Sequence, residues 1–164
     1  MKPLKIFLYT FLTLFLIFFI TRLITDKQLD DVTIGIQCDQ ELLEKADILY
    51  ITPFFNNTKI SSDNEWCNEI LNLNKELALH GVFHTYQEFQ EPRDKEYLQE
   101  GIQIFQDCLN EEPTRFKAPN LAWTKENNWI KEDFEVDLKW NQIFHKTSHC
   151  NDTGRFPNWL INLI

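Results

Sequence analysis

Glycine is scarce in this sequence, at 4 of 164 residues, and a glycine-rich loop of the GxxxxGKS/T type is absent. The chain therefore lacks the backbone cradle that phosphate groups need, which argues against nucleotide chemistry. Clusters of lysine and arginine are also absent, and the net charge is −9. Because contacts with a phosphate backbone need clustered cations, we expect no nucleic-acid partner.

The cysteines lack a CxxC pair, which argues against a structural zinc knuckle. They lie far apart in the chain, at Cys38, Cys67, Cys108 and Cys150. In an oxidising compartment they could form up to two disulfides, whereas in the cytosol they would be small buried hydrophobic residues. The sequence leaves both interpretations open.

A long stretch without charge, Ile6 to Thr21, lies near the start of the chain. It is shorter than the roughly twenty residues of a membrane-spanning helix, but Leu23 and Ile24 extend it beyond Arg22, whose long side chain can snorkel. A cleaved signal peptide and a buried core helix have similar compositions. Because no small-x-small cleavage site follows the run, a signal-anchor is the favoured interpretation.

Positive charges flank this run on both sides, with lysines before it and Arg22 and Lys27 after it. The positive-inside rule therefore favours a cytoplasmic amino terminus only weakly. We expect residues 1–24 to form a membrane anchor that contacts the membrane through residues 6–24. Residues 25–164 are expected to form one domain on the lumenal or extracellular side.

Strand-like and helix-like segments alternate beyond the anchor. Apolar runs and period-two alternation predict strands at residues 32–38, 48–51, 77–79, 115–118, 136–138 and 144–148. Helical spacing and capping residues predict helices at residues 40–46, 64–73, 98–109 and 124–130. Strands separated by helices indicate βαβ units, so we expect an α/β fold with a parallel sheet or barrel.

Two histidines stand four residues apart in the segment ELALHGVFHTYQEF, which covers residues 76–89. Gly81 directly after His80 favours a strand that runs into a loop over a helix that carries both rings on one face. Two imidazoles that leave the end of a strand together, from His80 and His84, make a good half-site for a divalent metal.

Two further polar residues are expected at the carboxyl ends of strands, which is where parallel α/β folds place their working residues. They are Lys117, ahead of Pro119, and His149 at the end of the last expected strand. His149 would serve as a general acid for a leaving amine, and Lys117 would stabilise developing negative charge. For Lys117, simple surface exposure is the alternative.

A metal held by two imidazoles and a carboxylate lowers the pKa of water and polarises a carbonyl group, which suits hydrolysis of an amide or ester. The neighbours Asp30 and Asp31 can supply one metal ligand and one general base. Their alternative interpretation is a solvated loop beside the membrane. Asp39 is the rival carboxylate, although helix capping also explains it.

At these residues the chain resembles the polysaccharide-deacetylase family. The segment ELALHGVFHTYQEF resembles the family's HxxxH region, and in particular a branch with an LHGxxH…EF signature. Other pieces are similar to further family motifs in the family's order: Leu29-Asp30-Asp31-Val32, Leu49-Tyr50-Ile51-Thr52-Pro53, Phe116-Lys117-Ala118-Pro119 and Lys146-Thr147-Ser148-His149. The resemblance covers most of residues 29–150, and the family usually has arginine where Lys117 stands.

The resemblance implies a distorted (β/α) barrel, here shortened, and a divalent metal, usually zinc. It implies Asp31, His80 and His84 as metal ligands, Asp30 as the base and His149 as the acid. On this basis we expect a membrane-anchored, metal-dependent hydrolase that removes N-acetyl groups from carbohydrate, cleaving a carbon–nitrogen amide bond that is not a peptide bond.

Two other interpretations remain open. One is a catalytically inactive carbohydrate-binding module that keeps the deacetylase fold, and the other is an ordinary α/β domain with a structural histidine pair. Tryptophans that could stack on sugar suit either the enzyme or the binding module: Trp123, Trp129, Trp140 and Trp159. The enzyme requires a carboxylate oxygen and a nitrogen from each of His80 and His84 to converge, with His149 facing the same cleft.

Overall fold

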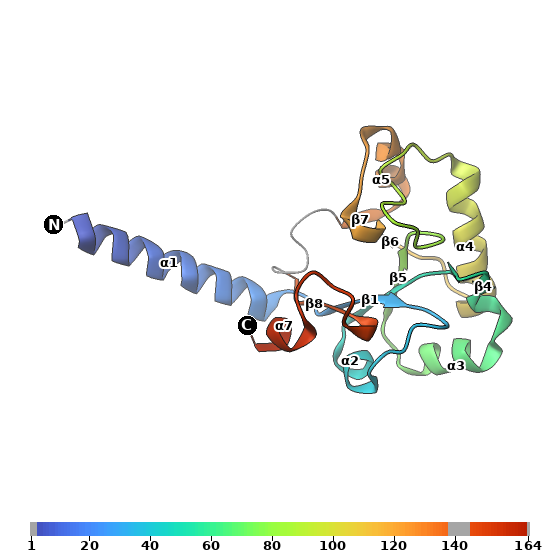
Figure 1. The fold of residues 1–164 in the computed structure, drawn as a ribbon, viewed down its shortest axis with the longest axis horizontal. Helices are drawn as coiled ribbons and strands as arrows, with labels where there is room; N and C mark the ends of the chain where they lie inside the picture. The colour runs from blue at the N-terminus through green and yellow to red at the C-terminus, as the bar shows by residue number, and fades with distance from the viewer. Residues whose placement is uncertain (1–2, 138–144, 164) are drawn as a thin grey trace.

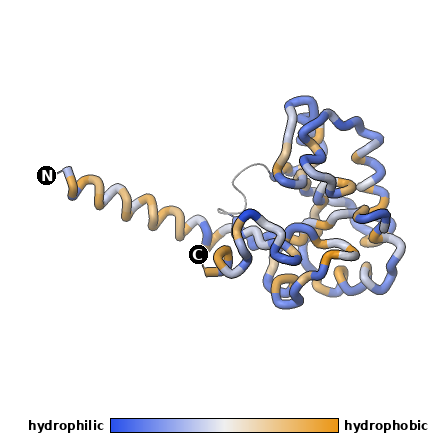
Figure 2. Tube along the Cα trace, in the orientation of Figure 1, coloured by the Kyte–Doolittle hydropathy of each residue, from blue (hydrophilic) through white to orange (hydrophobic). Residues whose placement is uncertain are grey.

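A computed structural model describes residues 3–137 and 145–163. The chain begins with the apolar helix α1 (Pro3–Ile24), which extends away from the rest of the molecule (Figure 1) and is hydrophobic over most of its length (Figure 2). Its 22 residues give a length of about 33 Å, which is enough to cross a bilayer. The hydroxyls of Thr10, Thr13 and Thr21 each donate to the carbonyl four residues earlier, so these polar groups are satisfied within the helix. By length and composition α1 can therefore span a membrane, and a signal sequence would pass the same test.

A parallel sheet forms the centre of the domain. Its strands are β1 (Gln28–Val32), β2 (Ile48–Ile51), β5 (Glu76–His80), β6 (Arg115–Lys117), β7 (Glu135–Asp137) and β8 (Thr147–His149). They are ordered β7-β6-β5-β2-β1-β8, and every neighbouring pair is parallel. The sheet curls into a half-barrel with β7 and β8 at its two edges. The expectation of a mixed α/β fold with a parallel sheet is confirmed.

Helices and one hairpin connect these strands, and η4 and α7 follow the last strand. The α-helices are α2 (Gln40–Lys45), α3 (Asn64–Asn72), α4 (Lys95–Leu109), α5 (Ile130–Asp133) and α7 (Asn158–Leu163). The 3₁₀ helices are η1 (Ile60–Ser62), η2 (Pro119–Leu121), η3 (Lys125–Trp129) and η4 (Cys150–Asp152), and β3 (Phe54–Phe55) pairs with β4 (Thr58–Lys59) in an antiparallel hairpin. Aspartates cap the amino ends of α3 and α4. Asp63 accepts from the Trp66 amide of α3, and Asp94 accepts from the Tyr97 amide of α4.

The prediction of the first strand was wrong. The alternating residues 32–38 form a strand only at Val32, and the following segment turns at Gly35, which has φ +90°. One side of this loop packs on the hydrophobic core, which explains why apolar Ile34, Ile36 and Cys38 alternate with other residues. The strand is instead Gln28–Val32, and all five of its residues are buried. Asp30 and Asp31 are therefore not a solvated loop.

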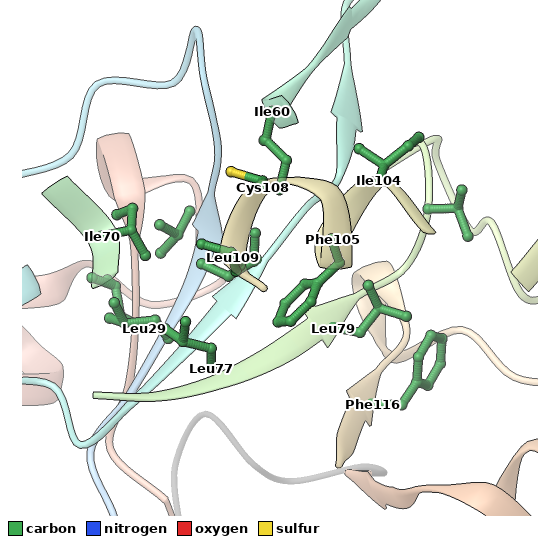
Figure 3. Packing of buried hydrophobic residues seen from close by; sticks show 14 of the residues in the cluster. Leu29, Ile60, Ile70, Leu77, Leu79, Ile104, Phe105, Cys108, Leu109 and Phe116 are labelled. Atoms are coloured by element: carbon green, nitrogen blue, oxygen red, sulfur yellow. The ribbon is translucent and has the colours of Figure 1, made fainter. Parts of the chain in front are cut away.

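The two faces of the sheet differ in chemistry because side chains alternate along each strand. The outer face carries apolar residues that pack under α3 and α4, and Figure 3 shows Leu29, Leu77, Leu79 and Phe116 of the strands facing Phe105 and Leu109 of α4. The inner face of the curl carries Ile48, Tyr50 and Ala78 together with buried polar groups. The hydrophobic core thus lies outside the curl, and the space inside it is left for polar side chains.

Both pairs of cysteines are joined. Cys67 of α3 bonds to Cys108 of α4, which ties together the two helices on the outer face. Cys38, in the loop after β1, bonds to Cys150, directly after β8. Of the two interpretations that the sequence leaves open, the structure supports the disulfides. Leu138, Trp140 and Phe144, which figure in the sequence predictions, lie outside the described residues.

Candidate metal centre

The inner face of the half-barrel brings polar residues from four strands to one cleft. β1 supplies Asp30 and Asp31, β5 ends in His80, β6 ends in Lys117 and β8 ends in His149. All four strands are parallel, so their carboxyl ends lie at the same edge of the sheet. The cleft that these residues line has a volume of about 370 Å³, and Thr153 and Arg155 complete part of its wall.

Asp30 and Asp31 are neighbours in a strand, so their side chains would ordinarily point to opposite faces of the sheet. The pairing of β1 with β2 shifts register between Leu29 and Val32, and Asp31 adopts a left-handed backbone with φ +65°. This irregularity turns the Asp31 side chain toward the cleft that already contains Asp30. A bulge therefore lets two consecutive carboxylates serve one site.

Asp31, His80 and His84 converge. The Oδ1 atom of Asp31 lies 2.6 Å from Nε2 of His84 and 3.2 Å from Nε2 of His80. One ligand atom from each of the three residues lies within 4.8 Å of the others. Burial alone would raise the pKa of Asp31, but hydrogen bonds from His80 and His84 and their charges hold that pKa well below its usual range. Burial would lower the pKa of His84, and the hydrogen bond to Asp31 raises it instead.

A backbone contact at Nδ1 fixes the orientation of the His80 ring. Its Nδ1 lies 3.1 Å from the carbonyl oxygen of Lys117, which also accepts the Gly81 amide at 3.0 Å. A carbonyl can only accept, so Nδ1 carries a hydrogen, and Nε2 is the nitrogen that gives up its hydrogen to Asp31 or a lone pair to a metal. This is the tautomer and orientation that a metal-ligating histidine needs.

The donor set therefore suits a divalent metal. Two imidazole nitrogens and one carboxylate oxygen match the ligands of catalytic zinc, in which three protein ligands leave positions open for other molecules. Among the described residues, the three are the group of histidine, cysteine, aspartate and glutamate side chains that could hold a metal ion. The structure thus brings together the three residues that the sequence predicts as ligands. Asp39, the rival carboxylate, instead caps α2 by accepting the Glu41 amide at 2.8 Å.

Lys117 is 1% exposed, so the alternative of simple surface exposure is wrong. Its ammonium donates to Oδ1 of Asp30 and to Oε1 of Gln28, both at 2.7 Å, and lies 3.7 Å from the centre of the Tyr50 ring. These contacts satisfy the ammonium within the wall of the cleft. Lys117 therefore neutralises and orients Asp30, and it has partners without any substrate.

The contacts of Lys117 belong to a polar network that crosses the inner face. Gln28 also accepts from Thr147 at 3.0 Å and donates to Asp137 at 3.1 Å, and Tyr50 donates a hydrogen bond to Asp137. Strands β1, β2, β6, β7 and β8 are thereby joined through side chains as well as through the backbone. The network satisfies the buried polar groups below the site and limits how Asp30 can move.

His149 lies beside Asp30 on the neighbouring strand, where the two residues are paired in register, and its Nε2 is 3.7 Å from Oδ2 of Asp30. The backbone of His149 is clamped by one side-chain amide, because Oδ1 of Asn158 accepts the His149 amide at 2.9 Å and Nδ2 donates to the His149 carbonyl at 2.7 Å. Asn158 thus takes the place of a neighbouring strand at the edge of the sheet. The disulfide at Cys150 secures the next residue.

Sequence reasoning missed several residues that shape the site. The hydroxyl of Thr153 donates to Oδ2 of Asp31 at 2.5 Å, which leaves Oδ1 for the two imidazoles. Gln28, Thr153 and Asn158 stand in no recognisable pattern, because their roles depend on partners from distant parts of the chain. The glutamate of the EF pair, Glu88, was visible as part of the motif but had no assigned role.

The tryptophans do not supply a stacking platform in the described part of the cleft. Trp123 packs on Phe89, Trp129 donates to the Arg93 carbonyl, and neither of them lines the cleft. Trp159 is exposed and lines a separate groove of about 750 Å³ beside α2. That groove has no histidine in its lining, so it lacks the chemistry of the metal centre.

No protein-family model matches this chain, and no curated protein matches it.

Proposed function

We propose that the protein is a metal-dependent hydrolase that removes N-acetyl groups from carbohydrate, with a shortened barrel of the polysaccharide-deacetylase type. The observation that carries the proposal is the convergence of Asp31, His80 and His84 in a cleft that also contains Asp30 and His149. Amide hydrolysis needs a Lewis acid that polarises the carbonyl, a base that takes a proton from water and an acid that protonates the departing amine. Each of the three has a candidate in this cleft.

The metal would be held by Oδ1 of Asp31 and by Nε2 of His80 and His84, and zinc suits this mixture of nitrogen and oxygen ligands. When bound, a divalent metal of this kind polarises an amide carbonyl and favours the loss of a proton from water. The remaining steps belong to the side chains of the chain itself.

Asp30 is the base. Lys117 occupies its Oδ1 atom, so Oδ2 is the oxygen that can accept a proton from water. That oxygen faces the cleft and His149. The water oxygen then bonds to the amide carbon as its proton passes to Asp30.

His149 is the acid. Its Nε2 lies in the same cleft, 3.7 Å from Oδ2 of Asp30, where a proton can be delivered to the amide nitrogen. The carbon–nitrogen bond breaks as this proton arrives, giving a free amine on the sugar and acetate. The cleft of about 370 Å³ lies within the range of small-molecule sites, and its polar lining suits the hydroxyl groups of a sugar unit.

The membrane is the second proposed partner, through α1. Only residues 25–27 separate α1 from β1, so Asp31 lies within about 25 Å of the end of the helix. A carbohydrate substrate would therefore have to approach close to the membrane surface. Two disulfides support a domain on the lumenal or extracellular side, because such bonds persist in oxidising compartments.

Metal analysis of the full chain, purified in detergent without a histidine tag, tests the proposal. We expect about one equivalent of zinc in the wild type and its loss in His84→Ala with the fold retained, because His84 is half-buried at the rim of the site. His145→Ala is the matched control, since His145 is not among the residues that line the cleft. A wild type that binds no metal contradicts the proposal.

Acetate release from an N-acetylglucosamine oligomer then separates the enzyme from its alternative. The enzyme releases acetate in the wild type, and Asp30→Asn abolishes release while zinc stays bound. Zinc binding with binding of the oligomer but no acetate release from the wild type would instead indicate the inactive carbohydrate-binding module.

A further inference from the structure

The loop that carries His84 has a backbone that needs support. It follows β5 and contains three left-handed residues, Gly81 with φ +63°, His84 with φ +53° and Gln87 with φ +52°. Glycine adopts this conformation freely, but a residue with a side chain does so only at a cost that neighbouring contacts must offset. The metal ligand His84 is therefore held in a conformation that its own preferences oppose.

The carboxylate of Glu88 supplies this support. It is 1% exposed, and it accepts the consecutive amides of Val82 at 2.9 Å, Phe83 at 3.1 Å and His84 at 3.0 Å. The hydroxyl of Tyr97 donates to the same group at 2.6 Å. Consecutive amides that converge in this way form an anion-binding nest. Here the anion is a side chain of the same loop.

Glu88 is itself fixed in place. Its amide donates to the carbonyl of Thr85 at 3.1 Å, and its own carbonyl accepts from Nε of Arg93 at 2.9 Å. The space around the carboxylate is also closed, since a Cβ atom at Gly81 would lie 2.5 Å from Oε2 of Glu88. The nest is therefore a tight fit for a carboxylate.

We infer that Glu88 is a positioning residue of the metal centre, which holds the left-handed backbone of His84 so that its imidazole meets Asp31 and His80. The inference rests on the proposed metal centre. Glu88 does not contact the ligand atoms, so it acts through the three backbone amides of residues 82–84. Without the carboxylate those amides lose a shared acceptor, and the ligand loop loses its preorganised shape.

Cobalt(II) titration of the full chain in detergent tests this role, because the visible spectrum of cobalt reports ligand geometry as well as affinity. We expect Glu88→Ala to weaken cobalt binding by at least about ten-fold and to change the spectrum. Acetate should restore the affinity and the spectrum by entering the emptied nest. The reference is the wild type at the same acetate concentration. Glu91→Gln is the matched control, because Glu91 is an exposed glutamate nearby, and it should behave as the wild type.

The outcomes are distinct. Wild-type affinity and spectrum in Glu88→Ala would overturn the inference while leaving the metal centre intact. A wild type that binds no cobalt contradicts the proposed function instead, and the position of Glu88 is then tested by the imidazole NMR signals of His84. Those signals should shift in Glu88→Ala and return with acetate, and unchanged signals would again overturn the inference.

If Glu88→Ala does not fold, Glu88→Gln replaces it, since its amide cannot accept all three backbone hydrogens. A Gln variant with wild-type binding would count against the role of Glu88.

Discussion

The two faces of the curled sheet are built from the same strands and do different work. On β2, Leu49 points outward into the hydrophobic core and Tyr50 points inward to the polar network. On β1, Leu29 faces the core, whereas Gln28 and Asp30 point inward and bind Lys117. The outer face is held by apolar burial, which is not directional, and the inner face by hydrogen bonds and charge pairs that depend on position. Alternation along a strand thus places apolar packing on one face of the sheet and the polar site on the other.

The largest expected effect is on the inner face, at Lys117. Lys117→Met keeps an unbranched side chain one atom shorter but leaves buried Asp30 without its cation. Breaking a buried pair in this way costs about 3–5 kcal/mol in the free energy of unfolding. Denaturant unfolding of the full chain measures the loss, with exposed Lys59→Met as the control. A loss similar to that of the control would mean that the inner network does not stabilise the fold.

The outer face should show a loss of stability without a loss of metal. Leu49→Ala removes a completely buried side chain from β2 and leaves a cavity, at a cost of about 2–5 kcal/mol. Because Leu49 points away from the cleft, we expect the folded variant to bind zinc with wild-type affinity. Unfolding curves and zinc titration on the same sample give both values. Weaker zinc binding in the folded variant would show that the two faces are coupled.

The sequence was sufficient to predict the outer face and part of the inner one. The apolar runs of β2 and β5 need no distant partner to be recognised, and the histidine spacing of His80 and His84 is local. β1 was misplaced because a strand with two adjacent aspartates looks unfavourable until Lys117, 87 residues away from Asp30, is placed beside it. The Asp31 partner His84 is similarly 53 residues away. Local patterns cannot show contacts of this kind.

The same limit applies to the choice between Asp31 and Asp39. Both adjoin the strand-like residues 32–38, Asp31 before them and Asp39 after them, and only the fold shows that Asp31 meets the histidines and Asp39 caps a helix. Thr153 carries no local signal at all, because its hydroxyl acquires its role from Asp31 across 122 residues. The chemistry of the site was thus predictable as a set of residue types, and the supporting contacts were not.

The smallest expected effect is on the pH dependence of stability in the metal-free protein, to which the inner face contributes and the outer face does not. The pKa of Asp31 is lowered in the folded state and that of His84 is raised. The stability from Asp31 is therefore present above its unfolded pKa of about 4 and is lost as the pH falls through the folded value. The stability from His84 is present below its unfolded pKa of about 6.5 and is lost as the pH rises through the folded value.

Thermal unfolding of the chelator-treated full chain should accordingly show a decrease in stability as the pH rises above about 6.5, where the ion pair of His84 with Asp31 loses its proton. The decrease should be smaller in His84→Ala, which lacks this titrating ring. Leu49→Ala should be less stable at every pH but should follow the wild-type profile, because an apolar face does not titrate. Saturating zinc should abolish the decrease, since the metal takes the place of the protons between Asp31 and the two imidazoles. Parallel pH profiles for wild type and His84→Ala would show that the ligand cluster contributes no pH-dependent stability, and the contrast between the two faces would then be limited to packing.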